Sequence, residues 1–254
     1  MMRAQAFFII LLIICGCSTS QWSTYWRVRE MALIQAPTVD LEDKNQKIVL
    51  SLPTQTVQRL LLSHIRITRS AGVQAELFIT EGNEPNAFAT VANGRRIIGI
   101  NVGMFKLVGG DIDEFAALIG HEAGHLAKGH LNSATLRSST IQGIGTLIGA
   151  GLGMAGVPGA GYITGLGADL IEASYSRDDE READALSIEY ILANGFDPEG
   201  AIRLHEKLLK LPGGIRIPFL NSHPSSEERI ENLKRLIASK KSDAQKNQQT
   251  GSNP

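Results

Sequence analysis

The sequence predicts an α+β fold that is mostly helical and contains one small β-hairpin sheet. Three observations support this class: apolar residues recur at helical spacing, short β-like runs are confined to residues 75–102, and Asn93-Gly94 joins two of these runs. Asn-Gly in that position is the strongest short signal for a hairpin. A chain of 254 residues with a formal net charge of −1 can form one domain with a sizeable core, and it lacks the basic block that a nucleic-acid partner requires.

Residues 1–16 are predicted to be a lipoprotein signal peptide. Arg3 precedes an apolar run, residues 6–14, that is too short to span a bilayer but suits a signal-peptide core. The run ends in Ile14-Cys15-Gly16-Cys17, which resembles a bacterial lipobox and implies acylation of Cys17. Loss of Cys15 with the signal then leaves no second thiol for a disulfide. The alternative is an ordinary cleaved signal with two incidental cysteines.

The first part of the mature chain is predicted to lead into the sheet. Residues 17–50 are polar with scattered aromatic residues, and we expect a lipid tether and a peripheral segment that ends in a helix. A helix is predicted from Pro53-Thr54 to near Gly72. Three β-like runs follow, at Ala75–Thr80, Ala87–Ala92 and Arg96–Val102.

The second half of the chain is predicted to be helical. Asp111 is the expected N-cap of a helix over residues 112–131. Three further helices are predicted at residues 178–193, 198–211 and 226–239, the last of them capped by Ser225. The polar residues 240–254 are expected to form a disordered tail, so the folded domain is predicted to span residues 51–239.

One pentapeptide in the first of these helices, His121-Glu122-Ala123-Gly124-His125, specifies a chemistry. Histidines four apart lie about 40° apart around a helix axis and one turn along it, so both rings can face one ion. Glu122 lies roughly 100° round, where it suits a base that takes a proton from water better than it suits a third ligand. This is the H-E-x-x-H arrangement of zinc peptidases, and the alternative is an ordinary helix with two histidines.

A third protein ligand is needed, because a catalytic zinc takes three and keeps one open position. His130 follows His125 by five residues, about 140° round the helix, and is expected to be structural. Glu180 and Asp184 are four apart on the next predicted helix, so Glu180 can bind zinc while Asp184 orients a ligand histidine. On spacing alone, the default alternative for this pair is a solvated, charged helix face.

The order of several motifs resembles one zinc metallopeptidase family, which includes the CAAX prenyl proteases, the HtpX heat-shock proteases and the mitochondrial Oma-type proteases. H-E-x-x-H is followed some 55 residues later by Ser176-Arg177, Glu180 and Ala183-Asp184 in an S-R-x-x-E-x-x-A-D pattern. The resemblance implies a zincin-like metalloprotease domain whose sheet lies beside the active-site helix. It also implies one Zn²⁺ per chain, bound by His121, His125 and Glu180, with Asp184 supporting the site.

Two other segments carry the same resemblance. The stretch Asn86, Ala87, Phe88 and Ala89, after Pro85, is similar to the family's edge-strand motif beside the active cleft, which implies a substrate-binding strand. His223-Pro224 with Arg229-Ile230 is similar to the family's closing H-P-x-x-x-x-R-I motif. The resemblance implies that His223 either binds the zinc in a latent state or, like Arg229, stabilises the oxyanion. The alternative is a turn histidine that only precedes the last helix.

The uncharged stretch from Ser138 to Ala168 contains ten glycines in 31 residues. A single membrane span here would put His121 and Glu180 on opposite sides of a bilayer, so we expect two small-residue helices instead. They would serve as a lid or as a surface facing a partner or the membrane, and a membrane hairpin is the alternative.

These observations predict a lipid-anchored zinc endopeptidase with Glu122 as general base. The lipobox places it in the periplasm of a Gram-negative bacterium, and Ser18 after Cys17 resembles the sorting signal for the outer membrane. By resemblance to the periplasmic lipoprotein branch, its substrates are unfolded or misassembled envelope proteins, and outer-membrane assembly machinery is an expected partner. One alternative is a zinc-binding, chaperone-like lipoprotein with a latent site blocked by His223. The other is a membrane-embedded protease.

Overall fold

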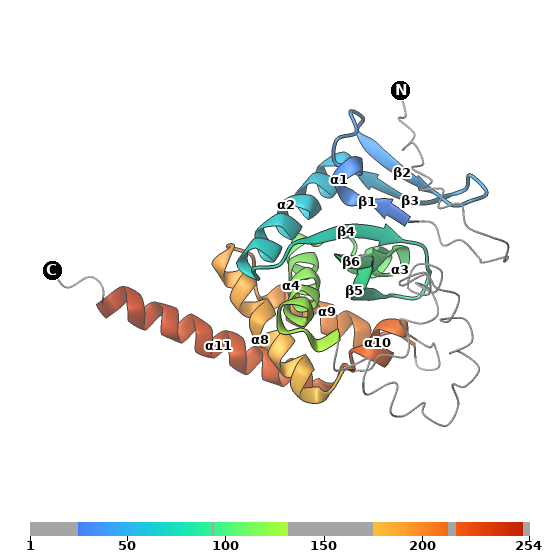
Figure 1. Cartoon of the computed structure of the whole chain (residues 1–254). Helices are drawn as coiled ribbons and strands as arrows, with labels where there is room; N and C mark the ends of the chain where they lie inside the picture. The colour runs from blue at the N-terminus through green and yellow to red at the C-terminus, as the bar shows by residue number, and fades with distance from the viewer. Residues whose placement is uncertain (1–24, 93, 132–174, 213–216, 251–254) are drawn as a thin grey trace.

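The computed structural model describes residues 25–92, 94–131, 175–212 and 217–250. The fold is α+β and mostly helical, as predicted (Figure 1). Its elements are, in chain order, β1 (Tyr25–Arg27), α1 (Val28–Met31), β2 (Thr38–Glu42), β3 (Ile48–Pro53), α2 (Thr54–Ser70), β4 (Ala75–Thr80), β5 (Ala87–Ala92), β6 (Arg95–Asn101), α3 (Val102–Val108), α4 (Ile112–Lys128), α8 (Arg177–Ala193), α9 (Glu199–Leu209), α10 (Pro218–Ser222) and α11 (Glu227–Thr250).

The larger sheet has four strands in the order β1-β4-β6-β5. β5 and β6 form the predicted antiparallel hairpin, in which Ala92 lies opposite Arg95. Gly94 in the turn has a φ of 72°, a left-handed conformation that glycine adopts without steric cost. β4 runs parallel to β6, and the short β1 adds to the other edge of β4.

The segment before α2 differs from the predicted peripheral helix. In residues 25–50, the described helix is the four-residue α1, and the rest of the regular structure is extended. β2 and β3 pair antiparallel in a separate two-stranded sheet, and Val39 and Leu41 of β2 are fully buried between half-buried neighbours. That burial pattern has the period of two that a strand requires. The strand is too short and too polar for this period to stand out in the sequence.

Helix α4 lies between the sheet and the other helices (Figure 1). It packs against β5 and β6 on one side and against α2, α8 and α9 on the others. Asp111 caps it as predicted, because its side chain accepts hydrogen bonds from the backbone N–H groups of Asp113 and Glu114. The helix ends at Lys128, three residues earlier than predicted, because Gly129 takes a left-handed conformation.

Glycines let α8 approach α4 closely. A Cβ atom on Gly120 would lie 2.7 Å from Oγ of Ser187, and one on Gly124 would lie 3.1 Å from Cα of Ala183. Oγ of Ser187 donates a hydrogen bond to the carbonyl oxygen of Ala117 at 2.8 Å, which joins the two helices. This close contact sets the distance between the side chains that α4 and α8 direct at each other.

The last helices complete the domain. α9 and α11 cover α8 in a second apolar cluster that contains Ile188, Ile191, Ala201, Leu233 and Ile237. Oγ of Ser226, not of the predicted cap Ser225, accepts the backbone hydrogen bond at the start of α11. α11 continues to Thr250, beyond residue 239 where we expected it to end, and it projects away from the body of the protein (Figure 1).

Several predicted features lie outside the described residues. These are the signal peptide, Cys17 and the glycine-rich stretch 138–168. Among the helices that the structure does describe, none combines the length and the apolar character needed to cross a membrane.

Candidate metal centre

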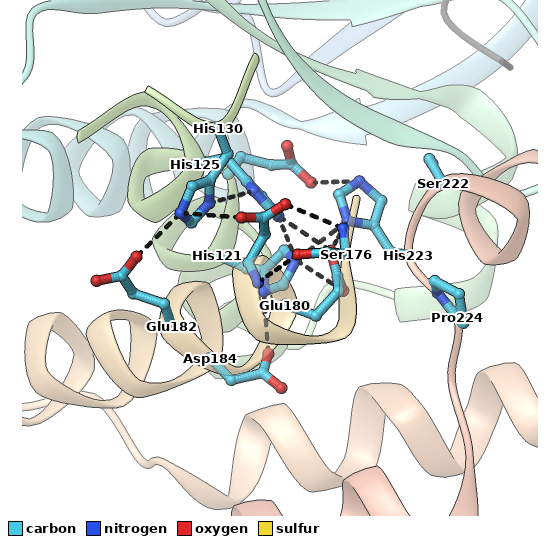
Figure 2. Close-up of polar contacts among 12 residues, drawn as sticks. His121, His125, His130, Ser176, Glu180, Glu182, Asp184, Ser222, His223 and Pro224 are labelled. Carbon is cyan, nitrogen blue, oxygen red and sulfur yellow. Dashed lines mark hydrogen bonds and ion pairs between the residues drawn. The ribbon is translucent and has the colours of Figure 1, made fainter. Parts of the chain in front are cut away.

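Four buried side chains from three parts of the fold converge on one point (Figure 2). His121 and His125 come from consecutive turns of α4, Glu180 comes from the first turn of α8, and His223 follows α10. Each offers a nitrogen or oxygen of the kind that binds metals, and these atoms all lie within 4.8 Å of one another. The structure thus brings together the three predicted ligands and the predicted loop histidine.

The distances within this cluster fit a tetrahedral zinc. Nε2 of His121 lies 3.0 Å from Nε2 of His125, 3.1 Å from Nδ1 of His223 and 3.5 Å from Oε2 of Glu180. Oε1 of Glu180 lies 3.2 Å from Nε2 of His125 and 2.9 Å from Nδ1 of His223. Ligand atoms placed about 2.0–2.1 Å from a tetrahedral zinc are roughly 3.3 Å apart. The donor set and its spacing therefore suit one zinc ion.

The first ligand histidine is oriented by a buried carboxylate. Nδ1 of His121 lies 3.0 Å from Oδ1 of Asp184, which leaves Nε2 facing the cluster. Arg229 in turn donates two hydrogen bonds to Asp184 and a third, of 2.5 Å, to Oε2 of Glu180. These residues are all buried. Asp184 thus lies where the resemblance placed it, next to a ligand histidine.

The second ligand histidine has different neighbours. Nδ1 of His125 lies 2.9 Å from Nδ1 of His130, whose Nε2 lies 3.0 Å from Oε2 of Glu182. The ring of Tyr175 stacks on that of His125, with 3.7 Å between the centroids. Sequence reasoning gave none of these three neighbours a place at the site. The available signals were the histidine five residues after His125 and the tyrosine directly before the second motif.

The carboxylate of Glu122 is completely buried beside the cluster. Among the described residues it accepts no hydrogen bond, and Nε2 of His223 is 3.5 Å from its Oε1. Burial raises the pKa of this carboxyl above its ordinary value, although His223 and His121 act in the opposite direction. A buried carboxylate without a hydrogen-bond partner has its full acceptor capacity available.

The charges of the cluster are strongly coupled. Burial would lower the pKa of His121, but Glu180 and Asp184 outweigh it and raise this pKa to about 9. Burial would raise the pKa of Glu180, but His223 and His121 outweigh it and hold this pKa well below its usual range. Burial lowers the pKa of His125, so its imidazole is neutral. A zinc ion at Nε2 of His121 would therefore compete with a proton for this nitrogen.

The predicted substrate-binding segment is the start of an edge strand. Among the described strands β5 pairs with β6 alone, so its other edge is unpaired. Asn101 fixes the start of the strand, because its side-chain oxygen accepts a hydrogen bond from the backbone N–H of Asn86 at 2.9 Å. Phe88 is buried against Gly99 and does not project into solvent. What this segment offers to a partner is its backbone edge.

Two other histidines lie outside the cluster. Nε2 of His64 lies 2.9 Å from the carbonyl oxygen of Ala75, and Nδ1 of His205 lies 2.9 Å from Oγ of Ser225. Both side chains are buried. We therefore regard both as ordinary core histidines.

The two helical histidines, the glutamate from a second helix and the buried carboxylate beside them form the kind of metal centre that is typical of zinc metallopeptidases of the H-E-x-x-H class. The model of Peptidase family M48 matches residues 51–237, and the chain belongs to this family. His121, His125 and Glu180 are accordingly its zinc site.

Known proteins of the same kind are similar to much of the chain. Metalloprotease YcaL of Escherichia coli (strain K12) is 31% identical over 159 residues, which are 63% of this chain and 61% of that protein. Metalloprotease LoiP of the same organism is 30% identical over 149 residues, which are 59% of this chain and 57% of that protein. The chain therefore spans about 60% of the length of these two relatives. The Beta-barrel assembly-enhancing protease of E. coli (strain K12) is 28% identical over 188 residues, 70% of this chain and 38% of that protein.

Proposed function

We propose that this protein is a zinc-dependent endopeptidase that is anchored by a lipid on Cys17 and hydrolyses unfolded or misassembled envelope proteins. The observation that carries the proposal is the placement of Glu122. Its free carboxylate lies beside a cluster of two histidines and a glutamate with tetrahedral spacing. A site that held zinc only for stability would have no use for a buried base.

The catalytic roles follow from this arrangement. Zinc bound by His121, His125 and Glu180 would polarise the scissile carbonyl and lower the pKa of the attacking water. Glu122 accepts the proton of that water and passes it to the leaving amine. No other described hydrogen bond competes for its oxygens.

His223 is the better of the two predicted groups for stabilising the oxyanion. The guanidinium of Arg229 is already bound to Asp184, Glu180 and the carbonyl oxygen of Pro224. Its role in this proposal is to hold Glu180 and Asp184 in place. His223 lies at the cluster itself and directly follows the short helix α10. A shift of the chain at the end of α10 would therefore change the position of the His223 ring relative to a bound metal.

The position of His223 also supports a latent resting state. Its Nδ1 is 2.9 Å from Oε1 of Glu180, which suits a fourth metal ligand. A fourth protein ligand would occupy the position that a catalytic zinc offers to water. This observation favours the second candidate function, a zinc-binding, chaperone-like lipoprotein whose site is blocked by His223. Glu122 argues against a permanent block.

Substrate binding is assigned to Asn86, Ala87, Phe88 and Ala89, at the edge of β5 that pairs with no other described strand. An extended segment can add to such an edge through main-chain hydrogen bonds, which read little sequence. This mode suits unfolded chains, which expose their backbone.

The name of the Beta-barrel assembly-enhancing protease supports outer-membrane assembly machinery as a partner. The formal net charge of −1 argues against nucleic acid as a partner.

The location in the periplasm, at the outer membrane, rests on the lipobox and on Ser18. Cys17→Ala should move the protein from the membrane fraction to the soluble periplasm or leave its signal uncleaved. Normal processing with unchanged fractionation would show that another part of the chain holds it, and residues 138–168 would be examined first.

Zinc content and cleavage of unfolded casein, measured on the same purified protein, test the activity. We expect about one zinc per chain, cleavage that a chelator abolishes, and recovery when zinc is returned. Glu122→Gln should keep the zinc and lower the cleavage rate by about 10²–10⁴-fold, because it removes the base and leaves the ligands. Full zinc occupancy in the wild type with no cleavage of any unfolded protein would favour the chaperone-like function. Loss of zinc in Glu122→Gln would show that Glu122 has another role.

A further inference from the structure

His130 lies beside the ligand histidine His125, on the side of the ring that faces away from the metal cluster (Figure 2). Its Nδ1 is 2.9 Å from Nδ1 of His125, and its Nε2 is 3.0 Å from Oε2 of Glu182. Oε1 of Glu182 contacts Nζ of Lys128 at 2.7 Å. A continuous chain of polar contacts thus runs from a metal-binding ring to the surface, where the side chains of Glu182 and Lys128 are 45% and 43% exposed.

The backbone conformation of Gly129 makes this contact possible. On a continuous helix, His130 would point about 140° away from His125. Gly129 ends α4 in a left-handed conformation, with a φ of 69°, and the chain turns there. The turn brings His130 back beside His125 and buries its side chain.

Metal binding by His125 determines which ring nitrogens of His125 and His130 carry a hydrogen. His125 directs Nε2 at the cluster, so its hydrogen must be on Nδ1, which donates to Nδ1 of His130. His130 then accepts at Nδ1, and the hydrogen on its Nε2 is donated to Glu182. The reverse arrangement would put a hydrogen on Nε2 of His125 and prevent it from binding a metal.

The two ligand histidines are therefore supported in different ways. His121 donates straight to Asp184, which Arg229 holds inside the protein. His125 donates to the imidazole of His130, and the Glu182 carboxylate at the end of this chain is half exposed. The support of His125 depends on an intermediate residue that can be changed without touching a metal ligand.

We propose that His130, held by Glu182, is a positioning residue that fixes the ring of His125 for zinc binding. It keeps the metal-binding nitrogen of His125 free of hydrogen and limits rotation of the ring, on which Tyr175 stacks from another side. Loss of such a partner typically weakens metal binding about 10–100-fold. The inference rests on the zinc site of the proposed function, but it does not depend on which proteins are cleaved.

The test is zinc affinity, measured by competition with a chelator in the absence of any substrate. His130→Ala should raise the zinc Kd by about 10–100-fold. It should also change the visible absorption of the cobalt(II)-substituted protein, because that spectrum reports the geometry of the ligands. Glu182→Ala should have a smaller effect in the same direction, since water can reach the exposed end of the chain. Glu182→Gln should restore the wild-type Kd, because its amide oxygen can still accept the hydrogen bond of His130.

Glu189 provides the matched control. It lies on the same helix, is 48% exposed and pairs with Nζ of Lys240, as Glu182 pairs with Lys128. Glu189→Ala should leave the zinc Kd and the cobalt spectrum unchanged. Wild-type values of both in folded His130→Ala would overturn the proposal, and so would equal losses in Glu189→Ala and Glu182→Ala. The zinc Kd and the cobalt spectrum are measured without substrate, so they do not depend on proteolysis. A failure to cleave unfolded protein in the separate casein assay would count against the proposed function, and not against the role of His130.

Discussion

Arg229 binds both carboxylate oxygens of Asp184, with Nε 2.9 Å from Oδ2 and Nη2 2.7 Å from Oδ1. Its remaining nitrogen, Nη1, donates to Oε2 of Glu180. One buried guanidinium therefore compensates two buried carboxylates, one of which binds the metal while the other orients His121. Removing it would leave the nearby histidines alone to offset the charge of these two buried carboxylates.

We therefore expect Arg229→Gln to lower the free energy of unfolding by about 3–5 kcal/mol, the usual result of breaking a buried ion pair from one side. Arg229→Lys should lose less, because it keeps the charge but cannot bind both oxygens of Asp184. Urea unfolding of the zinc-free protein measures both. Equal stability of Arg229→Gln and the wild type would show that water or another group compensates the carboxylates.

Glu180→Gln should lower zinc occupancy, as His125→Ala should, because each removes one of three ligands. Glu182 is unsuitable as a control for this change, since it is bonded to His130. Asp178 serves better: it is on the same turn of α8, its side chain is 89% exposed, and it pairs with Arg181. Metal analysis after dialysis should find wild-type zinc in Asp178→Asn. The same zinc content in Glu180→Gln would remove Glu180 from the metal ligands.

His223→Ala distinguishes a blocking ligand from an oxyanion group. We expect faster cleavage of an unfolded protein with zinc retained, because His223 lies within the cluster and is proposed to take the fourth coordination position. If His223 instead stabilises the oxyanion in the working enzyme, kcat should fall by about 10²-fold. A kcat equal to that of the wild type would contradict both roles and leave His223 as a turn residue before α11.

Gly124→Ala should destabilise the protein although alanine favours helices. The new Cβ would lie 3.1 Å from Cα and 3.2 Å from O of Ala183, so α8 would have to move. Such overpacking costs about 1–3 kcal/mol, whereas the helical preference of alanine over glycine is worth about 1 kcal/mol. The shift of α8 should also weaken zinc binding, because Glu180 moves with it. Ala127→Gly, on the exposed side of α4, measures the helical preference alone.

His205 should make the protein less stable in acid. Burial lowers the pKa of its imidazole to about 3, far below the ordinary 6.5. Between these values the unfolded chain holds a proton that the native protein does not. Stability therefore falls as the pH drops below 6.5, by up to about 1.4 kcal/mol per pH unit. His205→Gln should show a shallower dependence in urea titrations from pH 7 to pH 5. Parallel curves for the two proteins would place the acid sensitivity elsewhere.

The sequence predicted those parts of the site that depend on local geometry. The period of an α-helix puts His121 and His125 on one face of α4, and Glu180 and Asp184 on one face of α8. The hairpin of β5 and β6 followed from Asn93-Gly94 in the same way. These relationships hold over a few residues, so they can be derived without knowing how the chain packs.

Resemblance, rather than periodicity, was needed to connect the two helices. Nothing local in the sequence says that Glu180 faces His121 instead of solvent. That contact depends on Gly120 and Gly124, whose missing side chains let α8 approach α4. The same resemblance gave His223 its place near the site, but it did not give the distance to Glu180.

Only the tertiary structure revealed that His130 supports His125 and that Arg229 holds Asp184, the predicted partner of His121. His130 was expected to be structural because a continuous helix would turn it away from His125, and the left-handed conformation of Gly129 changes its direction. Arg229 was matched as a catalytic residue, but packing of α11 against α8 engages its guanidinium with Asp184 and Glu180. A sequence fixes which side chains are present and their order along each helix. Which of them meet depends on how far apart the packed helices lie and where the chain turns between them.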